Sequence, residues 1–245
     1  MSRDLSTMTW KEAEAALASG RAVIFPLGST EQHGPHLPLS TDTVLAGEWA
    51  RRIAAQIDAL VLPTLPYGQV WSARAFPGTI SLSSATLQAL IEETARSLHR
   101  HGVRRLVLLS AHEGNRQVMR AAARALLAEV PELKVLSLCH PDAAQVVQGI
   151  CDTPFWHGGT FHAAEVETSL MLAVAPEGCR MELAPREYPD VPPDFDTAPV
   201  PWDRFSRTGV FGDAGAATAE KGERLLEKWL AVMVERIRQG FEGSS

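Results

Sequence analysis

Short, unbroken apolar runs alternate with amphipathic segments along most of this chain, and this alternation restricts the fold more than any other feature. Four such runs span residues 22–27, 60–65, 106–109 and 133–138. Apolar runs of this length without polar alternation suit strands that are buried on both faces of a parallel sheet. The sequence therefore predicts a parallel sheet whose two faces are both covered.

The segments between these runs have helical periodicity. They span residues 10–17, 43–57, 84–101, 116–129 and 143–150, and a long terminal segment spans 220–241. The terminal segment places Leu225, Trp229 and Met233 on one side, as an amphipathic helix does. The alternation of strands and helices predicts an α/β layered fold with right-handed crossovers. With no boundary visible in 245 residues, a single domain over 1–245 is expected.

Two stretches interrupt this rhythm. Residues 70–84 contain Phe-Pro-Gly-Thr at 76–79, which indicates a turn between irregular segments. Residues 180–213 are rich in proline and acidic side chains, and a loop of this length inside a domain is usually functional or disordered. Its aromatic residues Trp202, Phe205 and Phe211 favour an ordered cover over the site, either of its own chain or of a neighbouring subunit.

Composition excludes several classes of protein. The net charge is −6 and no broad basic stripe is present, which argues against nucleic-acid binding. No apolar run approaches the roughly 18–20 residues that span a bilayer, and the N-terminus lacks a signal-peptide core, so a cytoplasmic protein without a membrane partner is expected. The widely spaced Cys139, Cys151 and Cys179 are interpreted as buried free thiols rather than a disulfide framework or a zinc-thiolate cluster.

The first cluster of polar side chains, residues 28–42, follows the first buried run directly. Ligand sites in parallel α/β sheets lie beyond the carboxyl ends of strands. Glu31 and His33 are two residues apart, so in an extended backbone they point the same way, and Asp42 begins a helix. Two carboxylates and an imidazole suit Zn²⁺ or Mn²⁺. The alternative is that Glu31 and His33 only pair at a loop surface and Asp42 only caps a helix. The role of His36 is undecided: it could bind the metal, support a ligand or contact the substrate.

The second cluster of polar side chains, residues 110–115, follows another buried run. His112, after the run at 106–109, should reach the same sheet edge as Glu31. Asn115 either caps the next helix or contacts substrate. Glu113 is interpreted as solvated, with an alternative role as a ligand.

The third cluster spans residues 157–169. If a helix begins near His162, then His162, Glu165 and Ser169 share one face, whereas Glu167 lies off it. This spacing favours Glu165 as a metal ligand and His162 as its catalytic neighbour. The alternative is that both glutamates only interact favourably with the dipole at the N-terminus of the helix.

At these clusters the sequence resembles the creatininase (creatinine amidohydrolase) family. The resemblance rests on Gly-Ser-Thr-Glu-Gln-His-Gly-Pro-His-Leu-Pro at 28–38 with Thr-Asp at 41–42, Phe-Pro-Gly-Thr at 76–79, His112 with Asn115, His-Ala-Ala-Glu-Val-Glu-Thr-Ser at 162–169, Thr-Gly-Val-Phe-Gly-Asp at 208–213 and Ala-Glu-Lys-Gly at 219–222. These strings occur in the expected order over most of the chain. The first string also resembles the mycofactocin-type, peptidase-like branch of the family.

The resemblance implies a three-layer α/β/α fold, a binuclear metal site and hydrolysis of C–N bonds in small molecules. It also implies homo-oligomers, often hexamers. Zinc or manganese is the expected metal, with iron as a further candidate. Carried over by position, Glu31 and His33 each face one ion, Asp42 bridges both, His112 completes one site and Glu165 the other. His162 matches the histidine that shuttles protons, and we assign Glu167 with it to the catalytic residues.

Two departures from the family pattern bear on the substrate. In creatininase itself, a glutamate two residues after the second-cluster histidine binds the second metal, whereas this chain has Gly114 there. Family members often have a histidine before Phe-Pro-Gly-Thr, where this chain has Trp71 to Arg74, so Trp71 and Arg74 are predicted substrate contacts, together with His36 and Asn115.

The predicted function is a binuclear metal-dependent amidohydrolase that cleaves an amide, cyclic amide or formamide bond of a small molecule or short modified peptide. One alternative keeps the metal and hydrolyses a sugar-derived ring or lactone. Another is a metal-stabilised scaffold without turnover. A serine hydrolase is disfavoured because the chain has no Gly-x-Ser-x-Gly motif.

Overall fold

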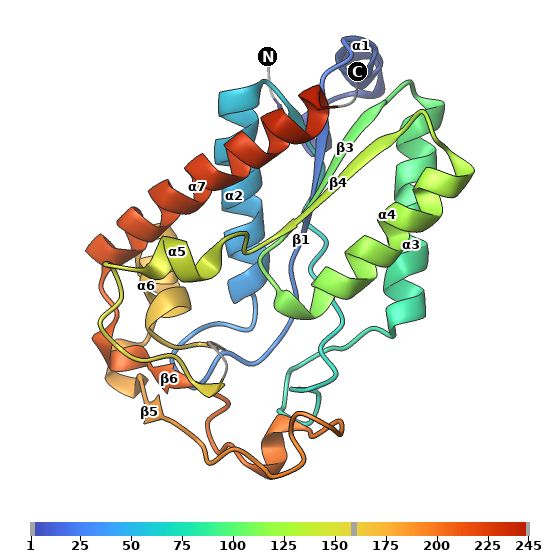
Figure 1. Cartoon of the computed structure of the whole chain (residues 1–245). Helices are drawn as coiled ribbons and strands as arrows, with labels where there is room; N and C mark the ends of the chain where they lie inside the picture. Colours follow the sequence, from blue (N-terminus) through green and yellow to red (C-terminus); the bar gives the residue numbers. More distant parts are fainter. Residues whose placement is uncertain (1–2, 158–160, 244–245) are drawn as a thin grey trace.

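The computed structural model describes residues 3–157 and 161–243, and it contains a four-stranded parallel sheet (Figure 1). Residues 1–2, 158–160 and 244–245 lie outside the described residues. The predicted domain over 1–245 and the third polar cluster over 157–169 are therefore described without them. The strands are β1 Val23–Leu27, β2 Leu60–Val61, β3 Arg105–Ser110 and β4 Lys134–Cys139, in the order β2-β1-β3-β4. All three pairings are parallel.

Helices cover the sheet on both faces, as the alternating pattern predicts. They are α1 Trp10–Ala18, α2 Thr41–Ile57, α3 Ser84–Arg100, α4 Arg116–Glu129, α5 Ala143–Val147, α6 Glu165–Val174 and α7 Ala219–Glu242. In Figure 1, α2, α5, α6 and α7 lie on one side of the strands, and α3 and α4 lie on the other. The predicted three-layer α/β/α fold is confirmed.

Side-chain alternation along the strands separates two hydrophobic cores. In β1, Ile24 packs with α2, α6 and α7, whereas Val23 and Phe25 pack with α3 and α4. In β3, Val107 points to the first core and Leu108 to the second. Strands buried on both faces need apolar side chains at successive positions, which explains why these runs show no polar alternation.

The connections after β1 and β3 leave on opposite faces of the sheet. The helix after β1, α2, joins the first core, and the helix after β3, α4, joins the second. Adjacent strands whose following helices diverge leave a crevice beyond their carboxyl ends, which is where ligands bind in open α/β sheets. The loops that carry the predicted site residues begin at this crevice.

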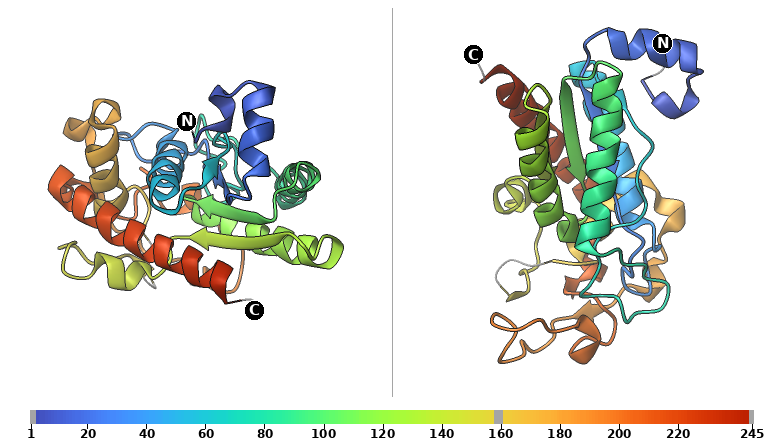
Figure 2. Two further views of the ribbon diagram at one scale, coloured as in Figure 1. Left: turned by 90° about the horizontal axis from the view of Figure 1, so that it is seen from above. Right: turned by 90° about the vertical axis from the view of Figure 1, so that its right-hand side faces the viewer.

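Residues 180–213 lie beyond the carboxyl ends of the strands, at the end of the molecule opposite α1 (Figure 2). They form short 3-10 turns and β5 Arg186–Glu187, which pairs antiparallel with β6 Gly212–Asp213. An aromatic cluster of Trp156, Phe195, Phe205 and Phe211 holds this segment together, with ring centroids 4.7 to 5.8 Å apart. No helix in the described ranges has the length and apolar character needed to cross a membrane.

Candidate metal centre

Five buried side chains from four segments converge at the crevice. Glu31 and His33 come from the loop after β1, Asp42 from the first turn of α2, His112 from the loop after β3, and Glu167 from the first turn of α6. Each is at most 8% exposed. Their ligand atoms form two groups within 4.8 Å of one another, Glu31 with Asp42 and His112, and His33 with Asp42 and Glu167. Asp42 belongs to both groups.

The first group is arranged around Nδ1 of His112. This atom lies 2.9 Å from Oε2 of Glu31 and 3.0 Å from Oδ2 of Asp42. The other ring nitrogen, Nε2, donates a hydrogen bond to the carbonyl of Gln69 at 2.8 Å. A backbone acceptor on one ring nitrogen fixes the tautomer that presents the other nitrogen to a metal ion.

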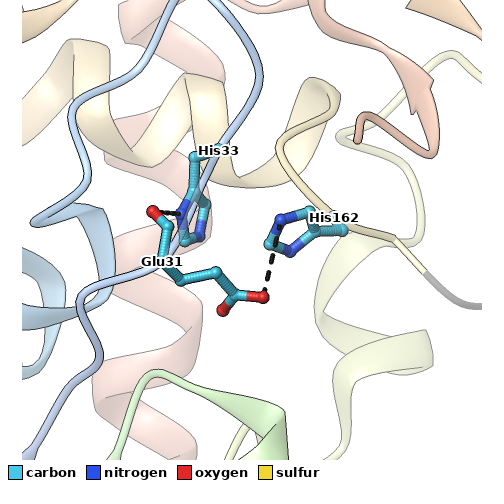
Figure 3. Close-up of side chains that lie close together, drawn as sticks. All are labelled: Glu31, His33 and His162. Carbon is cyan, nitrogen blue, oxygen red and sulfur yellow. Dashed lines mark hydrogen bonds and ion pairs between the residues drawn. The ribbon is translucent and has the colours of Figure 1, made fainter. Parts of the chain in front are cut away.

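The second group is arranged around Nε2 of His33. This atom lies 3.3 Å from Oδ1 of Asp42 and 4.0 Å from Oε2 of Glu167. Its Nδ1 donates to the backbone carbonyl of Glu31 at 3.1 Å, as Figure 3 shows. Each histidine therefore has one ring nitrogen on a backbone carbonyl and the other toward Asp42, Nδ1 in His112 and Nε2 in His33, and the two carboxylate oxygens of Asp42 are divided between them.

The buried atoms of the cluster fit divalent cations. Oε2 of Glu31, Nε2 of His33 and Oδ1 of Asp42 are buried and make no hydrogen bond, which is costly unless another partner neutralises them. Burial disfavours the charged imidazole, but the carboxylate of Asp42 outweighs it and raises the pKa of His33 to about 10. Burial is likewise overcome at His112, where Glu31 and Asp42 raise the pKa well above its usual value. A site that attracts protons this strongly also attracts metal ions, and its imidazole and carboxylate donors suit zinc or manganese.

Glu165 does not join this cluster, although the sequence favours it as the ligand. Its carboxylate accepts hydrogen bonds from the backbone of Asp152 and Thr153, the Thr153 hydroxyl, and Lys221 at 2.5 Å. The spacing argument fails because α6 begins at Glu165 rather than near His162. Glu167 instead points back, accepts the Ala163 N–H at 2.5 Å and faces His33. We therefore replace Glu165 by Glu167 in the candidate ligand set. Glu167, predicted from the sequence as a catalytic residue, thereby becomes a candidate metal ligand.

His162 lies beside the cluster without joining either group around Asp42. Its Nε2 is 3.9 Å from Oε1 of Glu31 (Figure 3). The same nitrogen is 2.9 Å from the carbonyl of Gln32, while Nδ1 is 4.0 Å from Oε2 of Glu167. Burial lowers its pKa to about 4, so the ring is neutral at neutral pH. With Nε2 donating to Gln32, Nδ1 is the nitrogen free to accept a proton.

A cavity of about 690 Å³ opens onto the cluster, a size typical of small-molecule sites. Its wall includes Glu31, Asp42, His112, His162 and Glu167, so a molecule in the cavity would lie against the cluster. The wall also contains Gln69, Trp71, Ser72, Phe161 and Trp202.

Trp202 comes from the 180–213 segment of the same chain. Its ring centroid lies 4.8 Å from that of His162, and its backbone N–H donates to Ser72. The segment therefore covers the site of its own chain. The sequence identified the aromatic residues, but nothing in it indicates which of them meets His162.

Of the four predicted substrate contacts, Trp71 alone lines the cavity. Arg74 is exposed, and its guanidinium lies over the Trp71 ring at 4.1 Å, outside the cavity wall. His36 is buried, with Nε2 2.9 Å from the Thr168 hydroxyl. Asn115 is buried at the N-cap position of α4, but its side chain makes no capping hydrogen bond and does not reach the cavity.

Asn115 has a supporting role that neither sequence interpretation included. Its Oδ1 accepts the Gln69 N–H at 3.1 Å, and its Nδ2 donates to the carbonyl of Gly28 at 3.0 Å. This side chain ties the loop after β1 to the loop that holds Gln69. The Gln69 carbonyl in turn orients the ring of His112. Asn115 therefore supports the group of Glu31, Asp42 and His112 indirectly, through Gln69.

The loop around Gly114 excludes a glutamate at that position. A Cβ there would lie 2.2 Å from the carbonyl oxygen of Gln69 and 2.4 Å from Nε2 of His112. Any side chain would therefore disturb the hydrogen bond that orients His112. Glu113, as the sequence predicts, is exposed and pairs with Arg116.

Comparison with known proteins identifies the family. The creatinine amidohydrolase family model matches residues 6–237. The chain belongs to the creatininase family. Creatinine amidohydrolase from Pseudomonas putida is 35% identical over 96% of this chain and 95% of its own length. Mycofactocin precursor peptide peptidase from Mycolicibacterium smegmatis is 31% identical over 89% and 84%. The 3-dehydro-scyllo-inosose hydrolase of Thermotoga maritima is 28% identical over 96% and 83%.

Solved creatininase structures have the same fold over nearly the whole chain. A crystal structure of creatinine amidohydrolase (creatininase) superposes with a TM-score of 0.89 at 35% identity, covering 98% of each chain. A manganese form of creatininase gives 0.87 at 34%, and a zinc–zinc form of a creatininase variant gives 0.88 at 34%, each covering 98% of this chain and 99% of the other.

Proposed function

We propose that this chain hydrolyses a C–N bond in a small molecule or a short modified peptide, using two divalent ions held by the cluster. The observation that carries the proposal is the position of Asp42, which turns one carboxylate oxygen toward His112 and the other toward His33. A carboxylate shared in this way is the usual bridge of a two-metal site. The family relationship supports amide hydrolysis.

The described residues divide into two ligand sets. Glu31, Asp42 and His112 would hold one ion, and His33, Asp42 and Glu167 the other. Divalent ions at such a site activate water and polarise a carbonyl. The manganese and zinc–zinc creatininase structures favour these two metals over others.

His162 is the group placed to move a proton during the reaction. Its Nε2 donates to the Gln32 carbonyl at 2.9 Å, which leaves Nδ1 facing the carboxylate of Glu167 and the cavity. A neutral imidazole accepts a proton from the attacking water and then delivers it to the departing nitrogen. Trp202 packs against the ring and excludes water from this side.

The metal content of the purified protein tests the proposal first. We expect at least about two equivalents of zinc or manganese per chain in the wild type, measured by mass spectrometry, and a loss of about two equivalents in Asp42→Ala because both ions of the centre share this ligand. A wild-type protein that stays metal-free after zinc and manganese are supplied would refute the binuclear site.

A substrate panel then separates C–N hydrolysis from the alternative activity. Amides, cyclic amides, formamides and short peptides should be tested beside lactones and cyclic sugar derivatives, because one relative is named as the hydrolase of an inosose. Turnover of lactones or ring compounds alone would favour that alternative. His162→Ala should keep its metal and lose about 10²- to 10⁴-fold in turnover.

A further inference from the structure

A second cluster of ligand side chains lies beside the proposed centre, and we propose that it is an additional site for a thiophilic divalent ion such as Zn²⁺. It consists of Glu113, Cys139 and His140, whose ligand atoms lie within 4.8 Å of one another. Within the described part of the chain, this is the one such group that includes a cysteine.

The sheet brings these three residues to one edge. Cys139 is the last residue of β4, where it pairs with Ser110 at the end of β3, and His140 follows it. Glu113 begins the 3-10 turn that follows His112. The loops after β3 and β4 therefore present a thiol, an imidazole and a carboxylate to the same point, and His140 and Glu113 also line the cavity.

The distances between the ligand atoms match those around a tetrahedral zinc ion. Sγ of Cys139 lies 3.6 Å from Nδ1 of His140 and 3.6 Å from Oε2 of Glu113, and the last two atoms are 3.9 Å apart. Tetrahedral geometry with ordinary Zn–S, Zn–N and Zn–O bond lengths places sulfur about 3.5 Å from either partner and nitrogen about 3.3 Å from oxygen. Only the last distance needs to shorten, and Glu113 is on the surface.

The ring of His140 is held rigidly in place. It is 6% exposed and packs edge-on or tilted against Trp49, Phe161 and Trp229, with centroids 5.4 to 5.8 Å away. Its backbone has φ of +41°, a left-handed conformation that is unfavourable for a non-glycine residue and that persists where the surroundings impose it. Its Nδ1 faces Cys139 and Glu113, whereas Nε2, the other ring nitrogen, is buried without a hydrogen-bond partner.

Two ligands of the cluster carry the charge that a divalent ion needs, and Arg116 beside Glu113 leaves a net charge of +1 once the ion is bound. When the metal–sulfur bond forms, the Cys139 thiol loses its proton to solvent, so thiolate and carboxylate together supply two negative charges. Neutral His140 supplies the third donor. Arg116 donates two hydrogen bonds to the Glu113 carboxylate, which holds it in position, and each carboxylate oxygen retains a lone pair for the metal.

Titration of the metal-depleted, full-length protein with Co²⁺ tests this site separately from the proposed centre. The ligands of that centre are carboxylates and imidazoles, so a thiolate-to-cobalt charge-transfer band in the near ultraviolet reports on coordination by a cysteine outside it, and the cysteine variants identify which one. We expect this band in the wild type and in Cys151→Ser, and its absence in Cys139→Ser. A wild-type titration that saturates without the band, or a band that survives in Cys139→Ser, overturns the inference.

A surface variant covers the case in which Cys139→Ser does not fold. Glu113→Gln leaves the buried thiol and imidazole intact and should weaken the cobalt affinity measured at the charge-transfer band by at least about tenfold. An unchanged affinity would remove Glu113 from the site and contradict the three-ligand arrangement. Because the band arises from the thiolate, both results hold whether or not the Asp42-centred cluster binds metal.

Discussion

Two glutamates that are two residues apart at the start of α6 have opposite environments. Glu167 faces His33 and the cavity, and burial raises its pKa to about 7. Burial would also raise the pKa of Glu165, but hydrogen bonds from Lys221 and Thr153 lower it instead. One carboxylate is therefore stabilised by neighbouring groups of the protein, whereas the other depends on a cation.

This difference predicts opposite metal contents for two matched variants. Glu167→Gln should bind about one equivalent of metal less than the wild type, because a neutral amide is a poor ligand for zinc or manganese. Glu165→Gln, the control, should keep the wild-type metal content and lose only stability. The measurement is metal per chain by mass spectrometry after dialysis. Retention by Glu167→Gln with loss in Glu165→Gln would reinstate the assignment of Glu165.

Gly114 offers a second test at this scale. In Gly114→Ala the added methyl meets the Gln69 carbonyl and His112 at once, so the imidazole should lose its orienting hydrogen bond. Loss of such support costs about 10- to 100-fold in metal affinity. In the control Gly215→Ala, the methyl meets nothing closer than 3.3 Å. Competition with a fluorescent zinc chelator measures both, and equal affinities would show that the Gln69 contact does not orient His112.

At the scale of elements, periodicity predicted the strands and helices well, because each buries a continuous apolar face. The start of α6 was not predictable in this way. Ala163, two residues before α6, has φ of +52°, and Glu167 accepts its N–H. The position of Glu167 rather than Glu165 beside His33 thus goes with a turn whose partners are known only from the fold. Gln69 was missed for the same reason, since a loop delivers it, and Trp202 was named as part of a cover without any indication that it meets His162.

Close packing between α6 and α7 gives an element-scale prediction. A Cβ at Gly222 would lie 1.9 Å from the backbone oxygen of Ser169, so Gly222→Ala forces the helices apart. We expect a loss of about 1–3 kcal/mol in the free energy of unfolding. Gly240→Ala, in the same helix, meets only the flexible end of Leu136 and should change stability by less than about 1 kcal/mol. Urea unfolding of both variants measures this, and equal stabilities would contradict the close contact.

Over the whole molecule, the 180–213 segment connects the surface to the site. Glu187 is its anchor: its carboxylate accepts hydrogen bonds from the Ser206 hydroxyl at 3.0 Å and from the N–H groups of Arg207 and Thr208 at 2.9 Å each. These residues lead directly from Trp202 to Phe211, which pairs with His162. Closure over the cavity therefore depends on one carboxylate outside it.

This anchor should make the cover sensitive to acid. Burial opposes ionisation of Glu187, but the hydrogen bonds from Thr208, Arg207 and Ser206 outweigh it and lower its pKa below the ordinary 4.5. Because the pKa of Glu187 is lower in the folded state than in the unfolded state, its carboxylate stabilises the fold fully at pH values above the ordinary pKa. This stabilisation is lost as the pH falls through the folded-state pKa. Protection against hydrogen exchange at residues 202–211, taken relative to the intrinsic exchange rate at each pH, should therefore be high at pH 7 and fall only below about pH 4.5. In Glu187→Gln this protection should already be low at pH 7, whereas the exposed control Glu182→Gln should behave as wild type. Slow exchange in Glu187→Gln at pH 7 would show that the aromatic cluster alone holds the cover.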